Sequence, residues 1–492
     1  MDDKRPLDLA PIRVGPPRLN PYHRLLARFY EPLFLLKALG ETRGGHSNEL
    51  PSRDADQERK RTFLKNLAYV CDFEKGGETT TAIALEELPD CYRFWVASNK
   101  GAEELVDFLN KVLNTLRRAG SSASLDPQAI ERNLVQDCVD FASRRIAKER
   151  KFLQREAEKC IASLIKPRSE AAEELCRWLE HARSSSTNIL LCYFAYEHRH
   201  LPIIQELGMQ SSYERERRGY SEQPTSFDLV RHYIGRLARH IRAPTQLFEA
   251  SAHLGHLIQT CTIHGIDPVT AVPAPVRDSH TTLPGILNRM FKHDDPEKGV
   301  IEDGIFYINK TCAVLDDFIS EYNDRPRRVH AEVQVLEHFY KLGLAFADND
   351  RYIACSKPAC LCCELYFKYH PARMVVPSSH RKLWSTWSPP LLTAFRKEDT
   401  ETQLQKRLLS SMCQDLRAQI ILQVLQRGRS SHWHPDSRTS ITGMPPELSF
   451  EVPNELDNYT TTMSVSAAEI DQEQDSAIDS DDGGVPISNL AY

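Results

Sequence analysis

The chain has 492 residues, of which 41% are hydrophobic and 26% are charged, so it is long enough for two or three globular domains. Its net charge of −6 is uneven, because residues 451–492 hold ten acidic residues and no Lys or Arg, which leaves +4 for the rest. A body this weakly basic carries no electrostatic signature of nucleic-acid binding.

Thirteen scattered cysteines and the lack of an apolar leader argue against a disulfide framework and predict reduced thiols. No run reaches the roughly 18 consecutive apolar residues of a membrane span. We therefore expect a cytoplasmic or nuclear protein without a membrane contact.

The first half of the chain predicts mostly helices. Residues 1–21 are rich in proline and predict a flexible arm. Residues 22–266 repeat apolar side chains every three or four positions, which is typical of a helical region. The helices are expected over 22–36, 103–118, 127–165, 169–184, 187–207, 227–241 and 245–262, with a loop over 41–61.

A proline-rich start to residues 267–299 predicts a linker, and the pattern that follows over 300–430 is mixed. Short strands are expected over 305–308, 351–356 and 374–376, and helices over 311–322, 333–343, 359–369 and 391–427. Residues 431–492, which end in the acidic stretch, predict a disordered acidic tail. The fold class is thus α+β, with a mostly α-helical N-terminal region before a mixed domain.

The candidate site is a split cluster, His330-Ala331-Glu332 and Cys360-Leu361-Cys362-Cys363. Cys360 and Cys363 stand at i and i+3, so both sulfurs face the same way on a helical turn. A helix N-terminus also favours the thiolate form that binds metals. His330 and Glu332 would lie about 200° apart on a helix, so they converge only in front of its N-terminus. Two helix N-termini are therefore expected to point at one metal ion.

The ligand types predict hydrolytic zinc chemistry. Three protein ligands, one imidazole and two thiolates, leave the fourth position of Zn²⁺ open for water, as in catalytic rather than structural sites. Zinc lowers the pKa of bound water to about 7. Glu332 can accept that proton and deliver it to a leaving ammonia. The expected reaction is hydrolytic removal of an amino group from an aromatic base.

The motif H-x-E followed by C-x-x-C resembles the zinc-dependent nucleic acid and nucleotide deaminase superfamily, the cytidine-deaminase-like proteins. The surrounding Ser356–Cys363, Ser379-His380 and Trp387-x-Pro389 look like a branch that is related to bacterial toxin deaminases and found in fungal genomes. The resemblance covers roughly residues 300–430. It leaves the preceding helical region unexplained.

This resemblance implies a three-layer α/β/α domain over 300–430 and a nucleotide or nucleic-acid substrate. It also implies that His330, Cys360 and Cys363 ligate zinc and that Glu332 carries the proton. The sequence departs from the family pattern at two points. Pro358 is one position further from Cys360 than in the usual Pro-Cys order, and one strand is visible where the superfamily has a β-hairpin before the H-x-E helix.

Weaker substrate-binding candidates flank the cluster. Arg328 could meet a phosphate, and His380, Trp384 and Trp387 could line a base pocket by stacking. A solvated turn for Arg328 and simple core packing for the three rings are the competing interpretations. Cys355 and Cys362 are read as buried side chains rather than ligands.

Two other functions remain open from the sequence. The first is a catalytically inactive interaction protein, in which zinc stabilises the fold and the helical region binds a protein partner. The second is a thiol redox module that uses Cys360 and Cys363, although such a module has no use for Glu332.

Overall fold

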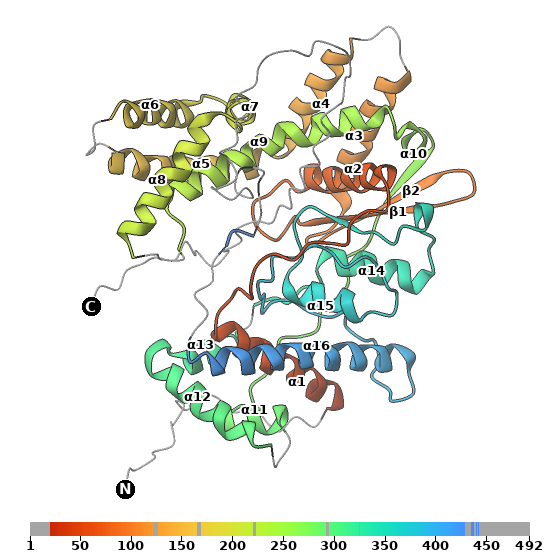
Figure 1. Cartoon of the computed structure of the whole chain (residues 1–492). Helices are drawn as coiled ribbons and strands as arrows, with labels where there is room; N and C mark the ends of the chain where they lie inside the picture. Colours follow the sequence, from red (N-terminus) through yellow and green to blue (C-terminus); the bar gives the residue numbers. More distant parts are fainter. Residues whose placement is uncertain are drawn as a thin grey trace.

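The computed structural model describes residues 20–121, 126–164, 169–219, 223–291, 295–323, 325–428, 434–436, 439 and 441. Within these residues the fold is α+β and mostly helical, as predicted, around a mixed four-stranded sheet with strand order β3-β2-β1-β4 (Figure 1). The strands are β1 (Thr81–Glu87), β2 (Tyr92–Ser98), β3 (Cys261–Gly265) and β4 (Ala354–Cys355). The predicted arm and tail fall almost wholly outside these residues.

The hairpin formed by β1 and β2 is the centre of the sheet, in a region where the sequence predicted helices. β1 pairs antiparallel with β2, so that Ile83 stands opposite Val96. β3 runs parallel to β2, and β4 runs antiparallel to β1. Residues on alternate sides of the hairpin enter two different cores, as the two-residue period of a strand requires.

Large side chains cover one face of the hairpin, among them Ile83, Phe94 and Val96. They pack against the helices that stand above the sheet in Figure 1. These helices are α2 (Ala55–Cys71), α3 (Glu103–Ser121), α9 (Ser226–Ser251) and α10 (Gly255–Gln259). α2 begins inside the segment predicted as a loop, where Asp54 caps it by accepting a hydrogen bond from Gln57 N.

Small side chains, Ala82, Ala84 and Ala97, cover the other face and let a helix approach the strands closely. That helix is α14 (Ala331–Leu342), with α15 (Leu361–Tyr369) beside it and the 3₁₀ turn η1 (Ala347–Asn349) after it. A further layer of helices packs beneath them (Figure 1). Its members are α1 (Pro21–Ala38), α11 (Leu283–Met290), α12 (Glu297–Cys312), α13 (Val314–Ser320) and α16 (Thr400–Leu425).

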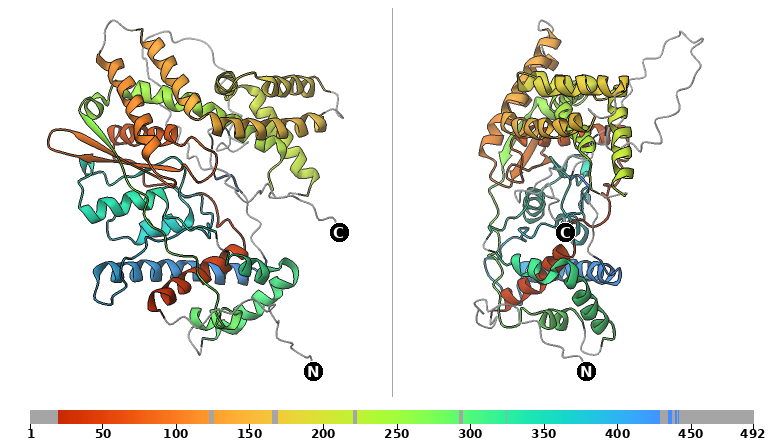
Figure 2. Two further views of the ribbon diagram at one scale, coloured as in Figure 1. Left: turned by 180° about the vertical axis from the view of Figure 1, so that it is seen from behind. Right: turned by 90° about the vertical axis from the view of Figure 1, so that its left-hand side faces the viewer.

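The remaining helices lie between β2 and β3 in the sequence and extend beyond the sheet (Figure 2). They are α4 (Pro127–Phe141), α5 (Ser143–Leu164), α6 (Glu170–Ser184), α7 (Asn188–His198) and α8 (Pro202–Arg217). They pack around α9 with a hydrophobic core of their own. The helical region predicted from the sequence thus contributes three strands, β1, β2 and β3, to the sheet and a separate helical layer.

Several local predictions were wrong. Residues 305–308 lie inside α12, because Ile301, Ile305 and Ile308 form one buried helical stripe that a short apolar run cannot reveal. The helix expected over 127–165 is broken at Ala142 into α4 and α5. The helix expected from residue 391 begins at Thr400, after Pro389 and Pro390, and residues 374–376, all described, form no strand.

A buried ionic network joins α5 to α9. The carboxylate of Glu149 lies 2.8 Å from Arg236 Nη2, 3.3 Å from Arg145 Nε and 3.1 Å from His240 Nε2. The side chains of Glu149, Arg145 and Arg236 are fully buried. Burial alone would raise the pKa of Glu149, but Arg236, His240 and Arg145 hold it well below its usual 4.5. Burial lowers the pKa of His240 below its usual 6.5.

We expect the thermal stability of the protein to fall on acidification. Below pH 6.5 the unfolded chain protonates at His240 while the folded chain resists it, and below pH 4.5 Glu149 adds a further loss. Both groups therefore make stability rise with pH across this range. Melting temperatures measured between about pH 8 and pH 4 check this expectation. The variant His240→Gln should show a shallower slope below about pH 6.5, and an unchanged slope in that variant would contradict the assignment.

Among the described residues, no helix combines the length and the apolar character that crossing a bilayer requires.

Candidate metal centre

His330 is the N-cap residue of α14. Its backbone is extended, with φ −68° and ψ 150°, and its carbonyl accepts the first hydrogen bond of the helix, from Val333 N at 3.0 Å. The amide of Ala331, one of the first N–H groups of the helix, donates to Asn99 Oδ1 at 2.8 Å. His330 is therefore held in front of the helix rather than on its side.

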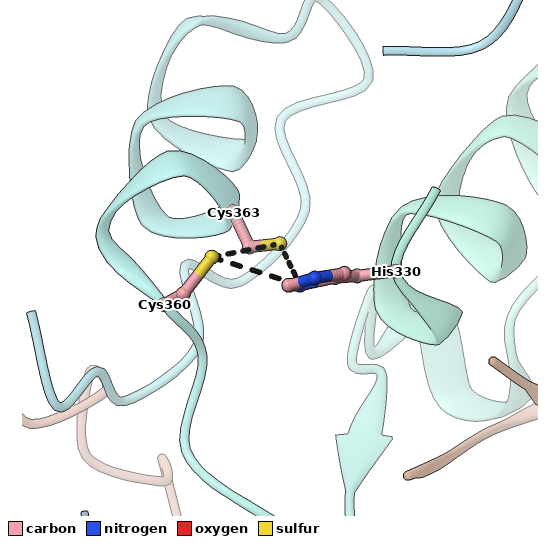
Figure 3. Close-up of side chains that lie close together, drawn as sticks. All are labelled: His330, Cys360 and Cys363. Atoms are coloured by element: carbon pink, nitrogen blue, oxygen red, sulfur yellow. Dashed lines mark hydrogen bonds between the residues drawn. The ribbon is translucent and has the colours of Figure 1, made fainter. Parts of the chain in front are cut away.

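Cys360 is the N-cap residue of α15, and Cys363 lies in its first turn. Backbone hydrogen bonds from residues 378–382 hold this entry in place. Ala359 N donates to Ser378 O at 2.8 Å, His380 N donates to Ala359 O at 3.0 Å, and Leu361 N donates to Lys382 O at 3.0 Å. The expected geometry is found: two helix N-termini meet at the cluster (Figure 3).

The three side chains point toward one another and form a compact triangle (Figure 3). Cys360 Sγ lies 3.6 Å from Cys363 Sγ and 3.6 Å from His330 Nδ1, and Cys363 Sγ lies 3.3 Å from His330 Nδ1. Tetrahedral zinc, with Zn–S of about 2.3 Å and Zn–N of about 2.0–2.1 Å, separates two sulfurs by about 3.8 Å and a sulfur from a nitrogen by about 3.5 Å. The triangle thus has the size of one face of a zinc tetrahedron, and the donor set fits the metal.

Electrostatics in this group favour one thiolate. Burial alone would raise the pKa of the Cys360 thiol, but hydrogen bonds with Cys362 and Cys363 and the charge of His330 hold it well below its usual value. Burial would lower the pKa of His330, yet the Cys360 thiolate raises it above its usual value. Metal binding would displace the remaining protons, since zinc takes thiolate and neutral imidazole.

Glu332 lies in the first turn of α14, beside the triangle. Its Oε1 is 3.9 Å from His330 Nδ1, and its side chain is 5% exposed. Burial raises the pKa of this carboxyl. Among the described residues, no group hydrogen-bonds its other oxygen, Oε2, although that atom is buried. The Glu332 carboxyl is thus buried directly beside the three ligand candidates.

The substrate-binding candidates occupy different environments. Arg328 is partly exposed and pairs with Glu78, at the edge of the site. His380 is buried, accepts a hydrogen bond from Lys382 N, and has a pKa lowered by burial to about 4, so it is neutral near pH 7. Trp384 is half-buried, with its ring 6.1 Å from that of His380. Their roles toward a substrate stay predictions.

Trp387 is fully buried, and its indole Nε1 donates a hydrogen bond to Cys363 Sγ at 3.1 Å. Its ring lies against Phe29 and Tyr366, with centroid distances of 5.5 and 5.9 Å. In this arrangement neither face of the indole ring is exposed. The contact that the ring makes at the site is its hydrogen bond to Cys363, one of the three ligand candidates.

Two cysteines near the triangle take no part in it. Cys362 is fully buried in the hydrophobic core, and burial raises the pKa of its thiol well above the usual value. Cys355 ends β4, and burial likewise raises the pKa of its thiol. Cys362 is thus buried, as interpreted, whereas Cys355 is only partly buried, and neither belongs to the triangle.

Asn99 and Glu78 also support the site, and the sequence analysis did not find them. Asn99 follows β2, donates from Nδ2 to Gly77 O at 2.7 Å, and receives the Ala331 amide. Glu78 precedes β1 and pairs with Arg328. Both are more than 200 positions from the H-x-E motif, so no local pattern connects them to it. Recognising the β1–β2 hairpin in the sequence could have pointed to them, because Glu78 and Asn99 flank its two ends.

Comparisons with known proteins agree with the site. Residues 329–391 match the family of OTT_1508-like deaminases, a range that contains the three ligand candidates and Glu332. No curated protein and no solved structure matches the chain significantly. The match spans 63 of the 492 residues, and over this segment the chain is similar to that deaminase family.

Proposed function

We propose that this protein is a zinc-dependent hydrolase that deaminates a nucleobase in a nucleotide or a nucleic acid. The single observation that carries the proposal is the position of Glu332, a buried carboxylate beside a zinc-sized His/Cys/Cys triangle. A purely structural zinc site is closed by a fourth protein ligand and has no need of a buried acid next to it. Here three protein donors would leave the fourth position of a tetrahedral ion to water, with the Glu332 carboxylate next to the triangle.

The chemistry divides between the metal and the chain. Zinc bound by the triangle would supply Lewis-acid activation of water, whose pKa such sites lower to about 7. Glu332 would accept one proton of that water and pass it to the ring nitrogen of the base, and would then take the second proton, from the hydroxyl now on the ring carbon, to the departing amine. The C–N bond breaks, a C=O bond forms, and ammonia leaves. Burial of Glu332 suits this role, because it raises the pKa of the carboxyl, which is the direction that helps a group to return a proton that it has accepted.

The proposed domain is a three-layer α/β/α unit that is not continuous in the sequence. α2 and α3 cover one face of the sheet, and α14 covers the other, with α15 beside it. The strands β1 and β2 would be the hairpin that the superfamily has before its H-x-E helix, here separated from α14 by the helices of residues 103–259. The domain predicted over 300–430 would then include residues 81–98 as well.

Substitution of Glu332 by Gln is expected to lower turnover by about 10²–10⁴-fold, the contribution of a positioned general acid–base group. Zinc content should stay at one per chain, because Glu332 is not one of the three ligand candidates. Base conversion by mass spectrometry and ammonia release, measured on nucleosides, nucleotides and single-stranded oligonucleotides, give the rates. Glu364→Gln, in the first turn of α15 and paired with Arg381, is a control that should keep its activity.

An equally active Glu332→Gln protein would rule out the proton-transfer role. A wild-type protein that holds zinc but converts no base in this panel would instead support the interaction protein, with a partner for the helical region.

A further inference from the structure

Trp387 contacts both halves of the candidate metal centre, although it lies outside the H-x-E and C-x-x-C motifs. Its indole N–H donates to Cys363 Sγ at 3.1 Å, inside the core. Its backbone forms a parallel bridge with Arg328, two residues before His330. In that bridge Arg328 N donates to Thr386 O at 2.9 Å and Ser388 N donates to Arg328 O at 2.8 Å.

The indole is held firmly in this position. The side chain is fully buried, Phe29 and Tyr366 pack against the ring, and Tyr30 Oη donates to Trp387 O at 3.0 Å. A flexible polar or charged side chain would lose conformational entropy on donating the same hydrogen bond to Cys363 Sγ. A packed indole is ordered already, so its N–H keeps one direction at little entropic cost.

We infer that Trp387 is a positioning residue for the metal centre, which orients the Cys363 sulfur through its indole N–H and holds the strand before His330 at a set distance from it. The inference rests on the proposed zinc site but not on its substrate. A thiolate bound to a metal retains electron density that an N–H donor stabilises, and a hydrogen bond from outside the ligand set fixes the direction of the ligand. Trp387 therefore affects both the affinity for zinc and the electronic character of the Cys363 sulfur.

The test compares full-length wild-type protein with Trp387→Phe, which removes the N–H and keeps an aromatic ring in the core. Competition with a chelator should show a zinc affinity lower by about 10–100-fold, the usual effect of losing a partner of a metal ligand. In the cobalt-substituted protein, the sulfur-to-cobalt charge-transfer band should move to lower energy, because Cys363 becomes more electron-rich. A merely structural role would leave that band in place.

Trp178→Phe, in α6 and far from the site in the fold, is the matched control and should change neither quantity. If Trp387→Phe unfolds, 3-benzothienylalanine at position 387 keeps the shape of the ring and replaces only the N–H with sulfur, and the same two shifts are expected. Wild-type affinity and an unmoved band in either variant would overturn the inference. A wild-type chain that binds neither zinc nor cobalt would overturn the candidate metal centre itself. A wild-type chain that binds both metals but converts no base would contradict the proposed deamination and leave the positioning role of Trp387 standing.

Discussion

Replacing His330 or Cys363 with alanine is expected to remove the bound zinc from the protein. Each side chain supplies one corner of the triangle, and two remaining donors cannot hold the metal against solvent. Because metal binding stabilises only the folded chain, its loss should also lower stability, by about 4 kcal/mol where free zinc exceeds its dissociation constant 1,000-fold. Elemental mass spectrometry gives zinc per chain, and thermal unfolding with and without chelator gives the stability.

Cys362→Ala is the matched control for this result. Cys362 is adjacent to Cys363 and fully buried, but it belongs to the hydrophobic core and not to the triangle. It should keep one zinc per chain, although it loses some packing and the hydrogen bond to Cys360. Zinc that persists in His330→Ala would contradict the assignment of the ligands, and a zinc-free wild type with a reversible Cys360–Cys363 disulfide would indicate a thiol redox module instead.

Replacing Glu149 with Gln is expected to destabilise the protein by about 3–5 kcal/mol, the usual cost of removing one partner from a buried ionic group. The amide keeps the size and some hydrogen bonds of the carboxylate, so the loss measures mainly its charge. The positive charges of Arg145 and Arg236 would remain fully buried without the negative charge of Glu149 to offset them. Urea unfolding, followed by circular dichroism, gives the change in the free energy of unfolding.

Glu158→Gln is a control in the same helix, since Glu158 is exposed and its substitution should change stability by no more than about 0.5 kcal/mol. A similarly small effect of Glu149→Gln would mean that the network does not stabilise the packing of α5 on α9. In that case the acid sensitivity expected from Glu149 should also be absent.

The same ionic network extends through Asp72 to Lys357, close to the candidate metal centre. Asp72, at the end of α2, lies 3.3 Å from Arg145 in α5 and 3.3 Å from Lys357, three residues before Cys360. All three side chains are buried. These ion pairs therefore connect the helical layer to the segment that carries Cys360 and Cys363. Removing either partner would leave the other charge buried without compensation, so the helical layer is structurally coupled to the candidate site.

The sequence by itself determined the local geometry of the candidate site. The spacing of Cys360 and Cys363 places both sulfurs on one turn, and the two-residue spacing of His330 and Glu332 is compatible with one metal only at a helix N-terminus. These are local constraints, so backbone geometry alone is sufficient to derive them, and α14 and α15 begin where they require. The mostly helical α+β class also followed from local periodicity.

Only the tertiary structure decided what surrounds that site. From the sequence, the residues of β1 and β2 were predicted as part of a helical region. They form the centre of the sheet because β3 and β4 pair with the edges of the hairpin and α14 covers one of its faces, all from distant parts of the chain. Asn99 meets Ala331 across more than 200 positions, and the indole of Trp387 donates a hydrogen bond to Cys363 Sγ. Such contacts depend on long-range packing, whose energy exceeds local propensity and leaves no periodic pattern in the sequence.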